Sequence, residues 1–197
     1  MMNPLSTAPA LLSARLKHET ATLHEQMHAL MEQAQPFASR AQYVRFVAAQ
    51  YHFQRDVEHL FDDPAIQAAV SDLQVRGREA AALADLADLE AAPGEAVIAT
   101  GNVAMPEALG WLYVSEGSTL GAAFLLKEVK DKLGLSESFG ARNLAAYPEG
   151  RAVVWRRFVS FLDAPGLSAQ EQDAVVAGAA AAFERFGVLL KRHFALD

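Results

Sequence analysis

Apolar residues recur along this chain at helical spacing, in long segments separated by proline and glycine. The first segment predicts a helix from about Ala8 to Ala34, which Pro36 stops. Ser39 and Gln42 form a capping box that opens a second helix, which continues through YVRFVAAQYHFQRDVEHLF. No stretch alternates between apolar and polar residues for long enough to predict a sheet.

The same signals predict the later elements, which are, in chain order, a helix from Ser71 to about Pro93, a loop or short extended piece at 94–105, a helix from Glu107 to about Leu133, an irregular stretch at 136–150, a helix at 151–164 and a last helix capped by Ser168. We find no internal repeat and no linker. The chain is therefore predicted to be an all-α, single-domain helical bundle that spans residues 1–197.

Composition and charge narrow the class of protein. A chain of 197 residues that is 52% hydrophobic and 21% charged is typical of one soluble domain. The net charge of −7 argues against nucleic acid as a partner, because phosphate binding needs clustered Lys and Arg. We expect no membrane span and no signal peptide. The absence of cysteine excludes disulfides and thiolate-bound haem, and it fits a cytoplasmic location.

The segment LHEQMH contains the pattern H-E-x-x-H, which on a helix is typical of zinc proteases. His24 and His28 are expected one turn apart on one helix face, with Glu25 displaced by about 100°. A zinc hydrolase also needs a third ligand, for which Glu58 and Glu116 are candidates. No predicted strand precedes this helix, and so short a pattern often arises by chance. Zinc hydrolysis and a purely structural role of the two histidines stay open as alternatives.

A stripe of glycines marks the long helix expected at 107–133. Gly110, Gly117 and Gly121 fall within about 40° on one helix face. Each glycine in a helix interior costs roughly 1 kcal/mol relative to alanine, so the backbone here must come close to something. The partner is either another helix or a flat, bulky ligand. Ser118 and Thr119 lie beside the stripe, where they could hydrogen-bond a small molecule or a water.

The first helix offers a matching set of groups. Lys17 and His24 are seven residues apart, so they share a helix face and lie about 10 Å apart along its axis. This separation is similar to that between the centre of a porphyrin and its carboxylate edge. A neutral imidazole can bind iron while an ammonium group pairs with a propionate. Tyr113, one turn before Gly117, could offer a phenol to the same edge.

These residues lie in segments that resemble the bacterial haem oxygenases, namely GWLYVSEGSTLGAAFLLKEV, LKHETATLHEQMH and PFASRAQYVRFVAAQYHFQRDVEHLF. The resemblance continues through SFGARNL and AFERFGVLL and so covers nearly the whole chain. It implies a helical haem-oxygenase fold, with haem between a proximal helix near the N-terminus and a kinked, glycine-rich distal helix. The implied reaction is oxidative cleavage of haem, both substrate and cofactor, to biliverdin, carbon monoxide and Fe²⁺.

The resemblance also implies roles for individual residues. His24 matches the proximal ligand to the haem iron. Gly117 and Gly121 match the distal glycines that leave space for dioxygen, and Ser118 and Thr119 would flank that space. One departure concerns His28, since many relatives have an acid there that hydrogen-bonds the proximal histidine. A neutral residue at this position should leave His24 a weaker, neutral donor.

A second group of residues bears on which carbon of the ring is opened. Lys17 and Tyr113 match the pair that anchors the propionates in relatives that open haem at the α-meso carbon, and Phe183 or Phe186 matches a residue of the pocket wall. Relatives that open other positions carry a lysine at the position of Glu128 and an asparagine at that of Lys17. The resemblance therefore implies biliverdin IXα as the product.

Partners follow from the same resemblance. The reaction needs dioxygen and an electron donor, expected to be a reductase, a ferredoxin or a flavodoxin. A bacterial phytochrome is the expected acceptor of the product, because bilin photoreceptors use the α isomer. A haem carrier or storage protein with the same pocket and no turnover is the alternative from another class.

Overall fold

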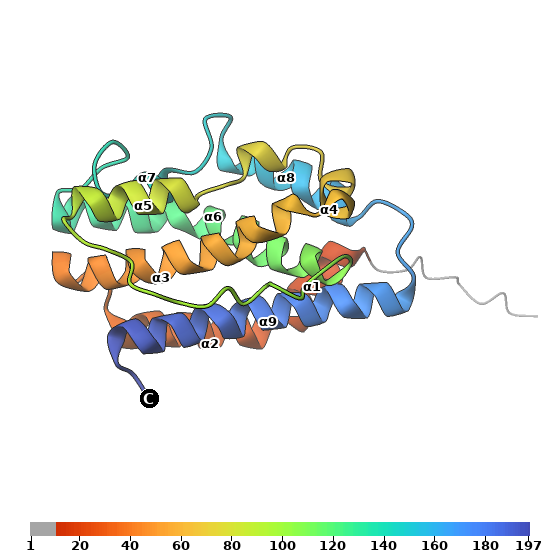
Figure 1. Ribbon diagram of the computed structural model, residues 1–197, viewed down its shortest axis with the longest axis horizontal. Coiled ribbons are helices and arrows are strands. Elements are labelled where there is room, and N and C mark those ends of the chain that lie inside the picture. Colours follow the sequence, from red (N-terminus) through yellow and green to blue (C-terminus); the bar gives the residue numbers. More distant parts are fainter. Residues whose placement is uncertain (1–10) are drawn as a thin grey trace, which may run out of the picture.

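The structure is a computed structural model that describes residues 11–197, where all regular elements are helical (Figure 1). The prediction of an all-α fold is confirmed. The elements are α1 (Leu12–Glu19), α2 (Ala21–Ala34), α3 (Arg40–Glu58), the 3₁₀ turn η1 (His59–Asp62), α4 (Pro64–Ala69), the 3₁₀ turn η2 (Leu73–Val75), α5 (Glu79–Asp88), α6 (Glu107–Leu133), α7 (Arg142–Ala145), α8 (Arg151–Leu162) and α9 (Ala169–Phe194).

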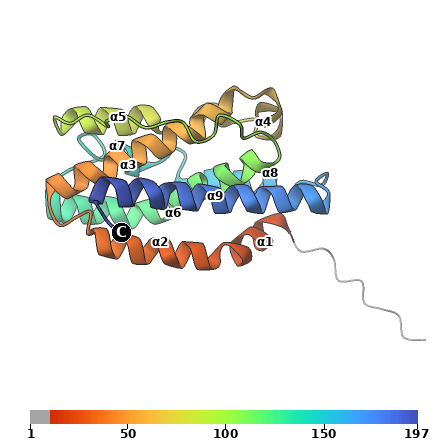
Figure 2. The same cartoon turned by 60° about the horizontal axis from the view of Figure 1, so that its bottom comes forward.

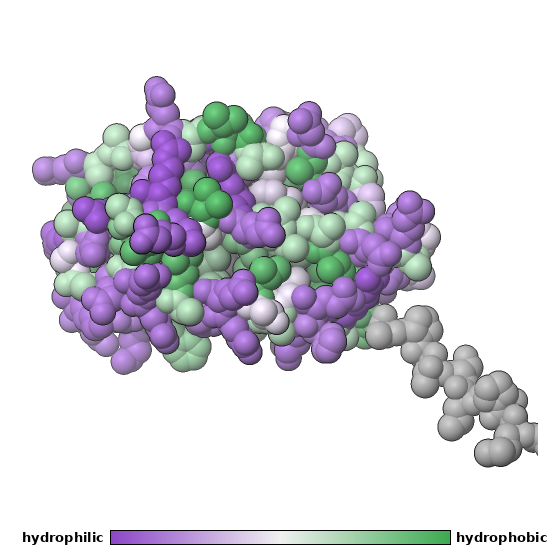
Figure 3. Space-filling view, turned by 90° about the horizontal axis from the view of Figure 1, so that it is seen from below, coloured by the Kyte–Doolittle hydropathy of each residue, from purple (hydrophilic) through white to green (hydrophobic). Residues whose placement is uncertain are grey.

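Helix α9 is the common support of the bundle. It packs most extensively against α6 and also against α3 and α2, as the two ribbon views show (Figures 1 and 2). The face on which α2 and α9 lie carries apolar patches among charged side chains (Figure 3). By contrast, α2 and α6 are not among the closely packed helix pairs of the described residues. Both helices therefore pack against α9 and not closely against each other. The space between α2 and α6 is called the gap below.

The predicted first helix is broken into α1 and α2 at Thr20. The buried Thr20 hydroxyl donates to the carbonyl of Leu16 at 2.8 Å, a local bond that bends helices. The expected start at Ala8 lies outside the described residues, and the helix begins at Leu12. Its end is as predicted, because Gln35 takes a left-handed conformation (φ 45°) directly before Pro36.

The prediction of one helix from Ser71 to Pro93 is wrong. The turn η2 and helix α5 occupy this range, and residues 76–78 between them belong to neither. Backbone amides of Arg78 and Glu79 donate to Glu58 Oε1, both at 2.5 Å, so a carboxylate from α3 caps α5. A Cβ on Gly77 would lie 2.7 Å from Glu58 Oε2. A cap supplied from a distant helix outweighs the local capping signal at Ser71.

The remaining helix signals are confirmed. Ser39 Oγ accepts from the Gln42 amide at 3.2 Å at the start of α3, and Ser168 with Glu171 forms a full capping box on α9. Helix α6 ends at Gly134, which has φ +68°. The helices enclose one apolar core whose fully buried members include Tyr43, Phe46, Leu112, Phe158 and Leu189.

Candidate active site

His24 lies on α2, one turn after the bend at Thr20, with an exposed side chain. Its ring centroid is 6.3 Å from that of Phe183 on α9 and 4.5 Å from that of His28. Partial burial lowers the pKa of His24, and nearby His28 lowers it further, against an opposing effect of Glu25. The imidazole is therefore neutral at pH 7, the form that can donate a lone pair to a metal.

The structure divides the glycine stripe of α6 into two parts. A Cβ on Gly110 would lie 2.1 Å from the carbonyl oxygen of Val175, so this glycine allows α6 to pack closely against α9. A Cβ on Gly121 would meet no atom within 4 Å, and one on Gly117 would meet only the Trp155 ring at 3.7 Å. Helix packing thus explains Gly110, whereas Gly117 and Gly121 border open space.

The two hydroxyl residues beside the stripe are placed differently. Ser118 is exposed, and its hydroxyl donates to the carbonyl of Ser115 at 2.6 Å. Thr119 is buried on the opposite side of α6 from Gly117, and its hydroxyl donates to the carbonyl of Glu116 at 2.6 Å. The expectation that Thr119 flanks the open space is therefore wrong, because a step of two residues turns its side chain into the core.

Lys17 and Tyr113 lie toward the α1 end of the gap. Lys17 is exposed on α1, three residues before the bend. Tyr113 is half-buried on α6; its burial raises the pKa of the phenol, and a hydrogen bond with Thr20 lowers it by a smaller amount. The phenol is therefore neutral and able to donate.

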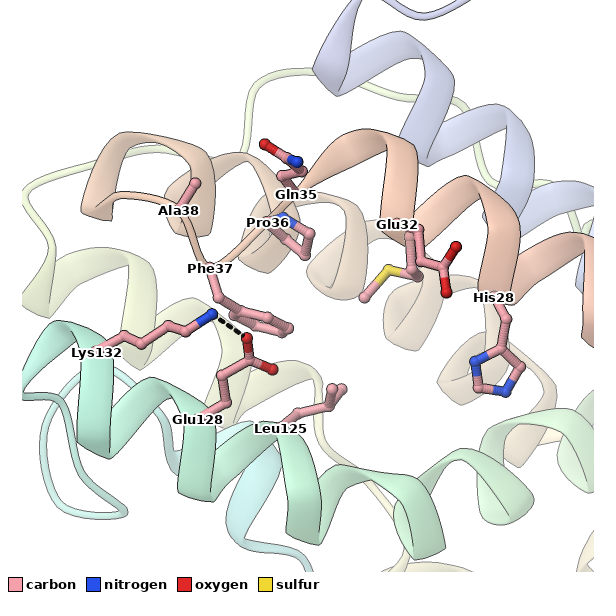
Figure 4. A pocket seen from close by; sticks show the side chains of 10 residues that line it. His28, Glu32, Gln35, Pro36, Phe37, Ala38, Leu125, Glu128 and Lys132 are labelled. Carbon is pink, nitrogen blue, oxygen red and sulfur yellow. Dashed lines mark hydrogen bonds and ion pairs between the residues drawn. The ribbon is translucent and has the colours of Figure 1, made fainter.

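A cavity of about 460 Å³ lies at the other end of the gap, between the C-terminal halves of α2 and α6 (Figure 4). His28 and Glu32 line it from α2, and Leu125, Glu128 and Lys132 line it from α6. Glu128 and Lys132 form an ion pair of 2.6 Å, so the charge of this lysine is already compensated. With Glu32 added, this end of the gap carries net negative charge.

Sequence reasoning missed Glu32 and Lys132 as lining residues. A signal existed for the first, because His24, His28 and Glu32 repeat at intervals of four and therefore share one face of α2. Lys132 follows Glu128 by the same interval on α6. What the sequence alone did not show is that these two faces confront each other across a cavity.

The zinc alternative lacks a ligand set. In the described part of the chain, no group of three His, Cys, Asp or Glu side chains is placed to hold a metal ion. Both proposed third ligands have other partners. Glu58 caps α5, and the Glu116 carboxylate accepts from Arg76 at 2.6 Å and from Tyr147 at 2.7 Å. The H-E-x-x-H pattern is therefore not a zinc site in this fold.

The gap does fit a flat, iron-bearing macrocycle. His24 on α2 carries a neutral imidazole, and on α6 a Cβ at Gly121 would meet no atom within 4 Å and one at Gly117 only the Trp155 ring at 3.7 Å. Two apolar side chains on that part of α6 are exposed, Leu120 at 37% and Phe124 at 78%. Large exposed apolar side chains grouped beside a cavity mark a ligand surface more often than a solvated one.

Comparison with known proteins identifies the family. Residues 10–192 match the family model described as heme oxygenase. The chain therefore belongs to the haem oxygenase family. It is 46% identical to heme oxygenase PigA of Pseudomonas aeruginosa over 194 residues, 98% of each protein.

Solved structures extend the comparison. The NO- and CO-bound heme oxygenase of Neisseria meningitidis aligns with a TM-score of 0.88 and 36% identity, covering 95% of this chain and 94% of the other. Heme oxygenases of Leptospira interrogans and Chlamydomonas reinhardtii share the fold at 17% and 16% identity, with TM-scores of 0.79 and 0.80. They cover 93% and 92% of this chain, and 100% and 97% of their own.

Membership of this family makes the chain an oxidoreductase that binds haem, with a histidine as the iron ligand and a reductase as the source of electrons. Haem supplies both the iron that activates dioxygen and the ring that is opened. No helix within residues 11–197 is long and apolar enough to cross a membrane.

Proposed function

We propose that this haem oxygenase opens haem at the α-meso carbon and releases biliverdin IXα, carbon monoxide and Fe²⁺. The proposal assigns His24 as the iron ligand and Lys17 with Tyr113 as the anchors of the propionates. The observation that carries it is the net negative charge of the cavity at the end of the gap away from α1, which disfavours propionates there. Membership of the family defines the reaction, and this negative charge favours one orientation of its substrate.

Haem carries two carboxylates, both on one edge of the ring. Lys17 is exposed on α1 and can offer an ammonium group to the α1 end of the gap, and the half-buried Tyr113 on α6 can offer a neutral phenol. At the far end, Glu32 and Glu128 face the cavity, and Lys132 is paired with Glu128. Carboxylates are attracted to the first end and repelled from the second. The orientation with propionates toward Lys17 is therefore preferred.

The residues around the iron position complete the proposal. Gly117 and Gly121 keep the α6 side of the gap free of side chains, so a small molecule fits between the backbone and the ring. Ser118 is exposed beside them and can hold a water near that space. Phe183 packs edge-on against His24 and fixes the direction of the imidazole. Each of these side chains binds or orients, and none is a strong acid beside the reacting carbon.

The wider setting is proposed on the same grounds. We infer that residues 1–197 form a single haem oxygenase domain, which the family match over 10–192 supports. The absence of cysteine favours the reducing cytoplasm. The electron donor is proposed to be a reductase with a ferredoxin or flavodoxin. A bacterial phytochrome is the proposed acceptor, because it would use the α isomer.

The decisive experiment supplies the protein with haemin, oxygen and an electron-donating system and separates the products by chromatography. We expect a green product that elutes as biliverdin IXα, and loss of the histidine-ligated haem spectrum in H24A. A haem spectrum without biliverdin would support a carrier. Another isomer would leave the protein a haem oxygenase and refute the proposed orientation of the ring.

A further inference from the structure

The backbone of α6 accepts several hydrogen bonds from side chains at the turn that contains Gly117. The carbonyl of Ser115 accepts from Arg78 Nη2 at 2.8 Å and from the Ser118 hydroxyl at 2.6 Å. The carbonyl of Thr119 accepts from Arg151 Nη1 at 2.5 Å. Added donors compete with the helical amides for these carbonyls and so bend or fix a helix locally.

Glu116 is the centre of this polar region. Its side chain is 3% exposed, and its two oxygens accept from Arg76 Nη1 at 2.6 Å and from the Tyr147 hydroxyl at 2.7 Å. The Arg76 side chain is fully buried and also holds Asp72 in a bidentate pair of 2.7 and 2.8 Å. Its guanidinium lies 5.3 Å from the ring centroid of Phe158 on α8.

This arrangement joins three separate parts of the chain at one residue of α6. Arg76 follows η2, Tyr147 follows α7, and Glu116 directly precedes Gly117. A buried ion pair adds little net stability, because desolvation offsets the attraction, but it demands a defined geometry. A purely apolar contact would hold α6 in place without fixing its rotation so closely.

Positioning is needed at this turn because the face of α6 that carries Gly117 and Gly121 is sparsely packed. Gly121 contacts no side chain, and Gly117 reaches only Trp155. Two glycines also make the helix more deformable than alanines would. The position of the α6 backbone beside the haem ring is therefore determined by the buried polar contacts around Glu116.

We propose that Glu116, held by Arg76 and Tyr147, is a positioning residue that fixes the distal segment 117–121 relative to the substrate. It lies on the buried flank of α6 and does not touch the ring, so it acts only through the backbone that follows it. The proposal builds on the haem oxygenase activity but not on the choice of the α carbon.

The first test measures hydrogen exchange in the haem-free protein. We expect E116Q to speed exchange of the amides of residues 117–123 by roughly tenfold to a hundredfold, the size expected when one hydrogen bond to a charged group is lost. Amides of α3 should keep their native rates. The matched control is E137Q, which removes an exposed carboxylate paired with Lys130 at 2.9 Å, and it should change neither region.

The second test compares the products of turnover. E116Q should bind haem as tightly as the native protein and give a broader mixture of biliverdin isomers, whichever isomer the native protein makes. Native exchange rates and a native isomer ratio would overturn the proposal. So would an equal rise in exchange across α3 and α6, which would mark a merely structural role. If E116Q does not fold, Y147F decides by the same criteria, with a smaller change expected because the Arg76 pair remains.

Discussion

Reversing the charge at the far end of the haem gap should redirect the ring opening. Glu128 faces the cavity between α2 and α6, where its carboxylate pairs with Lys132 at 2.6 Å. In E128K this pair becomes two like charges, and the end that repels carboxylates becomes one that attracts them. The propionates then have a second favourable position, and haem turned to reach it presents a different meso carbon to dioxygen.

The size of the effect can be worked from the exposure of the groups. Glu128 and Lys132 are 37% and 58% exposed, so an effective dielectric constant near that of water applies. For a propionate and a side-chain charge roughly 6 Å apart, at a dielectric constant of about 60, each unit of charge contributes about 0.9 kcal/mol to the interaction energy. The substitution changes two units, or about 2 kcal/mol, which alters the ratio of the two orientations by roughly 30-fold at low salt.

The assay is chromatography of the biliverdin isomers from E128K and from a matched control, E137K. The control reverses an exposed carboxylate that is also paired with a lysine, but Glu137 lies outside the cavity lining. We expect non-α isomers in E128K, fewer of them at high salt, and the native product in E137K. Equal isomer distributions in the two variants, with haem bound in both, would refute the electrostatic argument.

Two further predictions concern the glycines of α6 and the proximal histidine. G110A should destabilise the fold by about 2 kcal/mol or more, because its Cβ would lie 2.1 Å from the Val175 carbonyl oxygen. G121A should leave the stability unchanged or raise it by up to about 1 kcal/mol. Urea unfolding of the two variants measures the difference, and equal midpoints would contradict it. The pKa of His24 is lowered from its ordinary value of 6.5, and only the neutral ring binds iron. Haem titration should therefore show binding that persists below pH 6.5 and is lost as the pH falls through the lowered pKa of His24. An H28E variant exchanges a group that lowers this pKa for one that raises it, so its binding should fail at higher pH than that of the native protein, and an unchanged midpoint would show that His28 does not influence the pKa of His24.

Local signals in the sequence predicted most helices because their caps are local. Ser39 and Ser168 each act within three residues of the helix start that they define. The segment after Ser71 could not be predicted in this way. Its conformation depends on Glu58, some twenty residues away, and on the burial of Arg76 against α6. Long-range capping of this kind leaves no periodic trace in the sequence.

The candidate site shows the same division. The helical repeat placed Gly110, Gly117 and Gly121 on one face, but it could not show that one of them contacts α9 while the others border open space. Thr119 was misplaced because a motif records proximity in sequence and not the direction of a side chain. The negative end of the gap depends on Glu32 and Glu128, which line the same cavity from two different helices, and the spacing of residues in the sequence does not record this.

The dependence of α2 and α6 on a shared neighbour has a consequence for how the reaction ends. Each of these helices is anchored to α9, and in the described residues neither relies on the other for extensive packing. Spreading them apart breaks few direct contacts between α2 and α6, and the motion is taken up by the packing of α2 against α9. A rigid, planar substrate can contact α2 and α6 at the same time and so hold the two helices together. The open tetrapyrrole is flexible and no longer makes both sets of contacts as one rigid body. The fold thus allows release of the product by a loosening of two walls while the core stays closed.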